Sequence, residues 1–104
     1  MNCITAREAE ALVIAYNVKN KEAVQKAIPE CMKSIDETIR YFAKQGRGSI
    51  IVRVPTLVKE FENNDGFLDM LTEKLSNILI SFGYRVVLDE AENNIFVYWH
   101  TDNH

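Results

Sequence analysis

The sequence predicts a single α+β domain with two layers, in which helices pack on one face of a small three-stranded sheet. Three observations predict this class: residues 5–44 show helical periodicity, a β-branched run follows them, and two alternating segments flank a polar loop near the end. A length of 104 residues with 47% hydrophobic residues is enough for a core that needs no staple. The expected element order is ααβαββ over residues 1–104, with 1–4 and 100–104 frayed.

Two helices are expected at the start of the chain. Thr5 and Glu8 have the spacing of a capping box. Apolar residues then recur at spacings of three and four and mark one helix face: Ala6, Ala9, Val13 and Tyr16. This helix is expected to fade at residues 17–20, and Asn20 is a candidate N-cap for the next one.

The second helix is predicted from a longer apolar stripe with the same spacing. Its members are Val24, Ile28, Cys31, Ile35, Ile39 and Phe42. Pro29 interrupts the pattern, so it either kinks the helix or lies in the first turn of one that begins near Ile28. Cys31 is expected to be a small core residue, and both cysteines are expected to be reduced thiols.

The middle of the chain should hold a strand and a third main helix. Gly46-Arg47-Gly48 ends the preceding helix, and residues 49–54 form a strand that Pro55 stops. Residues 56–62 are expected to form a helical turn or short helix. Asp65 is a candidate cap for the third helix, and Gly83 should close it in a left-handed conformation.

The last two strands, residues 84–89 and 95–99, are expected to form a hairpin around a polar loop. Because successive strand residues face opposite ways, Phe96 and Tyr98 should lie on one face and Trp99 on the other. If the strand at 49–54 and the strand at 84–89 are parallel neighbours, the helix between them makes a right-handed crossover. An open sheet face would be a candidate contact surface.

Several classes of function are excluded or disfavoured by composition. A net charge of −3 and a pI near 5.3 disfavour a nucleic-acid binder, which needs a basic surface. No apolar run approaches the length of a membrane span, and no signal peptide is visible, so a cytoplasmic location is expected.

Candidate catalytic motifs have simpler structural explanations. His100 and His104 have a metal-chelating spacing but lie in the last five residues, where a polar tail is expected. The glycine-rich segment 46–49 runs from a helix into a strand, which is the reverse of a phosphate-binding loop. Acidic residues at 60–73 and 89–92 fit a solvated surface or an acidic docking patch. We therefore predict no enzyme, no catalytic residue, no cofactor and no metal site.

The terminal hairpin is the predicted binding surface. Both of its faces carry large apolar groups, which suggests that another element or another subunit covers the second face. The predicted interface residues are Tyr84, Phe96, Tyr98 and Trp99, with Glu90 and Glu92 at the rim. A protein partner is expected, and a homo-oligomer is possible.

The sequence also resembles a group of short bacteriophage proteins. The resemblance rests on Gly83-Tyr84-Arg85-Val86, on the closing Ile95-Phe96-Val97-Tyr98-Trp99 and on the opening Thr5-Ala6-Arg7-Glu8-Ala9. It implies a virus-encoded accessory protein that acts by binding a host or viral macromolecule in the bacterial cytoplasm, without catalysis.

Two alternatives to this accessory role stay open. One is a structural component of the virus particle that assembles through the same hairpin. The other is a protein that sequesters a small ligand, such as a nucleotide, through Arg47, Arg53 or Arg85.

Overall fold

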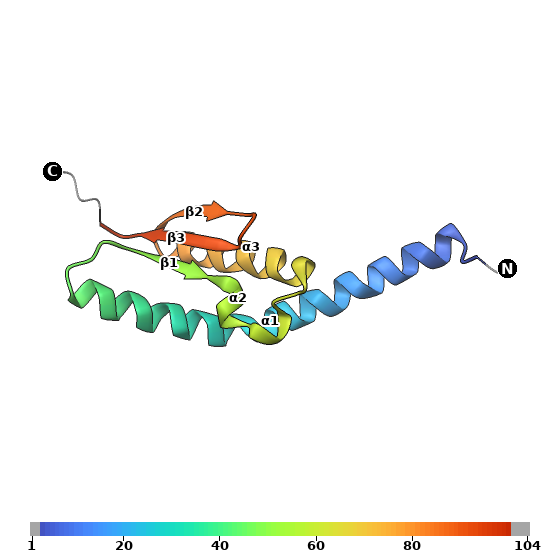
Figure 1. Ribbon diagram of the computed structural model, residues 1–104, viewed down its shortest axis with the longest axis horizontal. Coiled ribbons are helices and arrows are strands. Elements are labelled where there is room, and N and C mark those ends of the chain that lie inside the picture. Colours follow the sequence, from blue (N-terminus) through green and yellow to red (C-terminus); the bar gives the residue numbers. More distant parts are fainter. Residues whose placement is uncertain (1–2, 101–104) are drawn as a thin grey trace.

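A computed structural model, which describes residues 3–100, confirms the α+β class (Figure 1). Two long helices and a three-stranded sheet make up most of the chain, and two short helical turns connect β1 to α3. The elements are α1 (Ala6–Lys44), β1 (Ser49–Arg53), α2 (Val54–Leu57), the 3-10 turn η1 (Lys59–Phe61), α3 (Asp65–Ser81), β2 (Arg85–Asp89) and β3 (Asn94–Tyr98).

The two helices expected at the start of the chain are one continuous helix, α1. The predicted cap is confirmed, because the Glu8 backbone N–H donates to Thr5 Oγ1 over 3.1 Å. The predicted break at 17–20 is wrong. Asn20 lies inside α1 and is buried, and its side chain contacts Asn64 rather than capping a new helix. At 1.5 Å per residue, the 39 residues of α1 span roughly 58 Å, most of the 67 Å length of the molecule.

Pro29 lies within α1 and does not end it. Proline removes one backbone hydrogen bond and crowds the preceding turn, which bends a helix. Figure 1 shows that the blue N-terminal half of α1 and its teal C-terminal half run in different directions. Of the two alternatives predicted for Pro29, a kink within the helix or the first turn of a new helix, the fold therefore adopts the kink.

The sheet has the order β1-β3-β2, and both pairings are antiparallel. The predicted hairpin of β2 and β3 is confirmed. The condition for a right-handed crossover is not met, because β1 and β2 run in the same direction but β3 lies between them. The centre of the sheet is thus the last strand of the chain.

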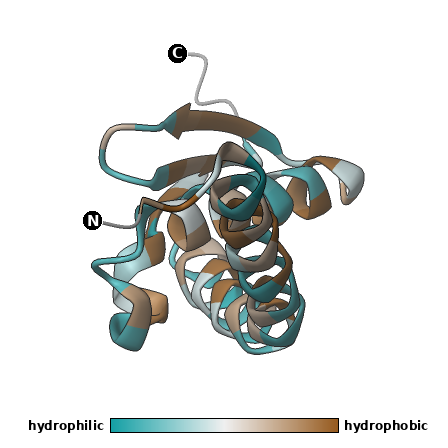
Figure 2. Ribbon diagram, turned by 90° about the vertical axis from the view of Figure 1, so that its right-hand side faces the viewer, coloured by the Kyte–Doolittle hydropathy of each residue, from teal (hydrophilic) through white to brown (hydrophobic). Residues whose placement is uncertain are grey.

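The core lies between the sheet and the pair α1 and α3, which pack against each other and against the strands. Figure 2 shows the strands on one side of the helices. Phe67 is fully buried on α3 and stacks on Phe61, with ring centroids 4.1 Å apart. Cys31 is buried as predicted, and burial, with smaller effects from Glu30 and Glu60, raises the pKa of its thiol.

Glycines and an asparagine set the ends of the helices. Gly83 has a φ of 95°, the left-handed conformation predicted for it, and Gly46, in the segment predicted to end α1, has a φ of 84°. The N-cap of α3 is Asn64 rather than the predicted Asp65, since Asn64 Oδ1 accepts the Phe67 N–H over 3.0 Å.

Candidate interaction surfaces

The face of the sheet that points away from the helices, here called the outer face, carries an uncovered apolar row. Residues Ile51, Phe96 and Val87 lie opposite one another on the three strands. Ile51 and Val87 are 51% and 52% exposed, and Phe96 is half-buried between them. On the inner face the neighbouring residues Ile50, Val97 and Val86 pack into the core. The condition for a contact surface on the sheet, one open face, is therefore met within the described chain.

Polar and charged groups flank this apolar row. On one side, the guanidinium of Arg85 lies 5.2 Å from the centre of the Tyr98 ring, which shields part of that ring. On the other side, the register places Arg53 and Asp89 on either side of Asn94. The outer face thus has an apolar centre with a mixed-charge rim, the layout of many protein interfaces.

The six residues predicted to form one interface are divided between different surfaces. Phe96 and Tyr98 lie on the outer face. Tyr84 and Trp99 meet edge to face, with ring centroids 6.4 Å apart, and pack against the core from the inner side. Glu90 and Glu92 are exposed in the loop between β2 and β3.

A second uncovered surface is the first part of α1, residues 6–19, here called the projecting segment. Figure 1 shows it extending beyond the sheet and α3. Its large apolar side chains are half or more exposed: Leu12, Val13, Ile14, Tyr16 and Val18. Residues 11–16 are apolar on every side of the helix, a pattern found in helices that are covered by other elements.

The projecting segment continues the stripe that α1 buries against the domain. Within the domain this stripe contains Asn20, Val24, Cys31 and Ile35, which are all buried. Towards the N-terminus the same helical spacing continues through Tyr16, which is half-exposed beside the start of α3. It then runs through Val13, Ala9 and Ala6, which lie beyond the domain. The sequence pattern predicted this helix face but not that α1 outgrows the domain.

A polar network marks the point where α1 leaves the domain. The Tyr16 hydroxyl donates to Asn64 Oδ1 over 2.8 Å, and Asn64 Nδ2 donates to Asn20 Oδ1 over 3.3 Å. Gly66 permits this close approach, because a Cβ there would lie 3.2 Å from both Asn20 Nδ2 and the Tyr16 hydroxyl. The network ties the start of α3 to the base of the projecting segment.

We expect Asn64→Ala to lower the free energy of unfolding by about 1–2 kcal/mol, because it removes the α3 cap and the partner of Tyr16 and Asn20. The exposed neighbour Asn63→Ala is the matched control and should change this free energy by less than about 0.5 kcal/mol. Urea denaturation measures both. Equal effects at the two positions would show that the network does not hold the helices together.

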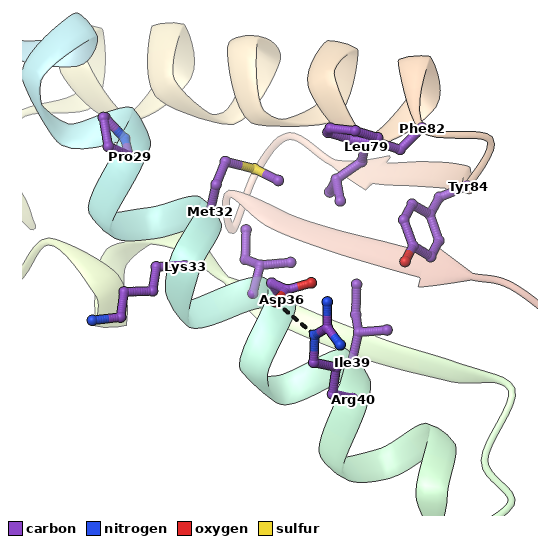
Figure 3. Close-up of a pocket in the computed structure, with 10 residues that line it drawn as sticks. Pro29, Met32, Lys33, Asp36, Ile39, Arg40, Leu79, Phe82 and Tyr84 are labelled. Atoms are coloured by element: carbon purple, nitrogen blue, oxygen red, sulfur yellow. Dashed lines mark hydrogen bonds and ion pairs between the residues drawn. The ribbon is translucent and has the colours of Figure 1, made fainter.

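A groove with a mainly apolar lining lies between α1 and the end of α3 (Figure 3). Its volume is about 550 Å³, within the range of small-molecule sites. Met32, Leu79 and Tyr84 line its floor and wall. At its mouth Arg40 Nε donates to Asp36 Oδ2 over 2.8 Å, and this hydrogen bond raises the pKa of Arg40.

The arginines considered for ligand binding do not meet in one site. Arg47 lies 5.3 Å from the Phe42 ring centre, at the α1–β1 turn. Arg53 and Arg85 lie on different edge strands and on opposite sides of the apolar row. The groove in Figure 3 contains none of the three.

The acidic residues of α3 and of the hairpin loop do meet, around a hollow of about 480 Å³ that is lined by Asp69, Glu73 and Glu90. Asn93 reaches into it and donates to Asp69 Oδ1 over 3.0 Å. Within residues 3–100 no cluster of three or more His, Cys, Asp or Glu side chains has a metal-binding arrangement. His104 of the predicted histidine pair lies outside the described residues, as do residues 1–2 and 101–103.

None of the helices between residues 3 and 100 combines the length and apolar character needed to cross a bilayer. Comparisons with protein-family models, curated proteins and solved structures gave no match to this chain. Any assignment of function therefore depends on the two uncovered apolar surfaces and the groove.

Proposed function

We propose that this protein is a non-catalytic accessory protein of the bacteriophage type, which acts in the bacterial cytoplasm by binding a protein partner on the outer face of its sheet. The observation that carries this proposal is the uncovered row of Ile51, Phe96 and Val87 at the centre of that face. Its mechanism is steric: a rigid sheet face covers a surface that the partner needs for its own activity.

The chemistry of the outer face fits a protein partner better than a nucleic acid. A branched and aromatic centre with few charges provides binding energy when water is excluded from it, as in interface hot spots. Arg53, Arg85 and Asp89 at the rim give no continuous basic surface for phosphates. The partner that fits is a protein with an exposed apolar patch.

The test is capture of a partner from bacterial lysate with four proteins: wild type, Phe96→Ser, Val87→Asp and the control Ile80→Asp. Ile80 is 54% exposed on α3, away from both the outer face and the projecting segment, so it matches Val87 in exposure. We expect wild type and Ile80→Asp to retain one partner protein in stoichiometric amount. The two outer-face variants should retain at most about 10% of that amount, which corresponds to a tenfold or greater loss of affinity. Equal capture by the outer-face variants would overturn the proposal.

A second candidate function, sequestration of a small ligand, is favoured by the size and apolar lining of the groove in Figure 3. A bound mass that survives purification and is lost in an Arg40→Trp variant, which adds a ring at the exposed mouth of the groove, would support it. Recovery of many copies in purified particles would instead support a structural role in a virus particle.

A further inference from the structure

We propose that a second copy of this chain covers the projecting segment, and that the two segments pair antiparallel with Ala6 of one copy opposite Tyr16 of the other. This inference does not depend on the partner proposed for the outer face. It rests on where the uncovered stripe begins and ends and on the sizes of its residues.

The uncovered stripe has a definite length. It begins at Ala6, directly after the Thr5 cap, and it ends at Tyr16, whose hydroxyl is bonded to Asn64 at the start of α3. Beyond Tyr16 the stripe is covered by the domain itself, starting with the buried Asn20. A helix laid on the stripe therefore meets the start of α3 as a stop. Two stripes bounded in this way overlap fully in only two registers: antiparallel, with Ala6 of one copy opposite Tyr16 of the other, or parallel, with like residues opposite each other.

The residue sizes select the antiparallel register. The stripe carries its small residues, Ala6 and Ala9, at one end and its large residues, Val13 and Tyr16, at the other. An antiparallel pair places Ala6 against Tyr16 and Ala9 against Val13, so that every layer has one small and one large side chain. A parallel pair would place Tyr16 against Tyr16 and Ala6 against Ala6, which crowds one layer and leaves a void in the other.

The flanks of the stripe are compatible with this arrangement. Leu12 lies on one side of it and approaches its counterpart across the two-fold axis, which adds apolar contact. Glu10 lies on the other side and approaches its own counterpart, where two like charges repel weakly in water. Dimerisation should therefore strengthen as salt is added, unlike an association driven by opposite charges.

The size of the contact predicts a reversible dimer. A stripe roughly 15 Å long covers on the order of 400 Å² on each chain, about half of what standard interfaces bury. We expect a dissociation constant in the range of about 1–100 µM. The two domains would lie at opposite ends of the paired helices, each with a free outer face.

Sedimentation velocity over about 5–500 µM tests the oligomeric state, with Val13→Asp as the variant and Ile80→Asp as the matched control. Val13 is 58% exposed, so its replacement should leave the fold intact, which circular dichroism checks. Wild type and Ile80→Asp should convert from monomer to dimer over this range, and Val13→Asp should weaken dimerisation at least tenfold. A wild-type monomer throughout, or a Val13→Asp dimer of unchanged affinity, would overturn the proposal.

Cysteine cross-linking tests the orientation with single cysteines placed on α1, in a background where the exposed Cys3 is replaced by serine. In the antiparallel pair Leu12 lies close to its counterpart, whereas the two Ala6 residues are about 15 Å apart along the helices and cannot form a disulfide. Mild oxidation should therefore link Cys3→Ser/Leu12→Cys into covalent dimers and leave Cys3→Ser/Ala6→Cys unlinked. Efficient linkage of Cys3→Ser/Ala6→Cys would show a parallel pair and contradict the proposed register.

Discussion

Replacing Phe67 by alanine is expected to lower the free energy of unfolding by about 3–5 kcal/mol, the usual cost of deleting a buried aromatic ring. Phe67 has no exposed surface, and its ring stacks on Phe61 under the start of α3. Its removal leaves a cavity at the point where α3, η1 and α1 meet, and the helices on either side cannot close it without losing their contacts with the sheet.

Phe82→Ala is the matched control for this effect. Phe82 follows α3 and is 71% exposed, so the same chemical change should cost less than about 1 kcal/mol. Urea denaturation followed by circular dichroism gives both values. Similar losses for the two variants would contradict the burial of Phe67 in the core between the sheet and the two helices.

Replacing Pro29 by alanine is expected to raise the free energy of unfolding by about 1–3 kcal/mol. Pro29 lies inside a continuous helix, is exposed and cannot donate the backbone hydrogen bond that an alanine would make to residue 25. Alanine restores this bond and removes the clash with the preceding turn.

The exposed neighbour Glu30→Ala serves as control, because it changes a side chain in the same turn without adding a backbone donor. It should shift the free energy of unfolding by less than about 0.5 kcal/mol. If Pro29→Ala instead destabilises the protein, the bend in α1 is required for its packing against α3, and proline is favourable there.

Local patterns were sufficient to predict the hairpin and the facing of its residues. Alternation in β3 placed Phe96 and Tyr98 on one face and Trp99 on the other, and the structure has this arrangement. Successive side chains of an extended strand point to opposite faces of the sheet, so this facing follows once the segment forms a strand. The order β1-β3-β2 could not be predicted in the same way, because it depends on where α1 and α3 place β1 relative to the hairpin.

The asparagines show why the helix boundaries were harder to predict. Asn20 resembles an N-cap in sequence, but its side chain is used in a contact with Asn64, forty-four positions away. Asn64 in turn takes the capping position predicted for Asp65, because it also binds Tyr16. In both positions contacts with residues distant in the sequence determine the role of the asparagine, and local helix propensity contains no information about such contacts.

The projecting segment could not be predicted either, because its exposure also depends on contacts between distant parts of the chain. The spacing of Ala6, Ala9, Val13 and Tyr16 predicted a helix face, and a helix face says nothing about the length of the domain that packs on it. The apolar residues on both faces of the terminal hairpin suggested self-association there. The projecting segment is the surface that the structure adds.

Together, the two proposed interfaces predict a bivalent protein. If the projecting segments hold two copies end to end, each complex presents two outer faces, and a multivalent target would be bound more tightly by the dimer than by a single domain. The Val13→Asp variant separates these contributions, because it keeps the outer face and loses the second copy.

The most direct test of association through the outer face is native mass spectrometry of the complex formed with the captured partner, for wild type, Phe96→Ser and Val13→Asp. We expect two chains with two partners for wild type, one chain with one partner for Val13→Asp, and no complex for Phe96→Ser. A complex of unchanged stoichiometry with Phe96→Ser would contradict the account, since the partner would then be bound elsewhere on the molecule.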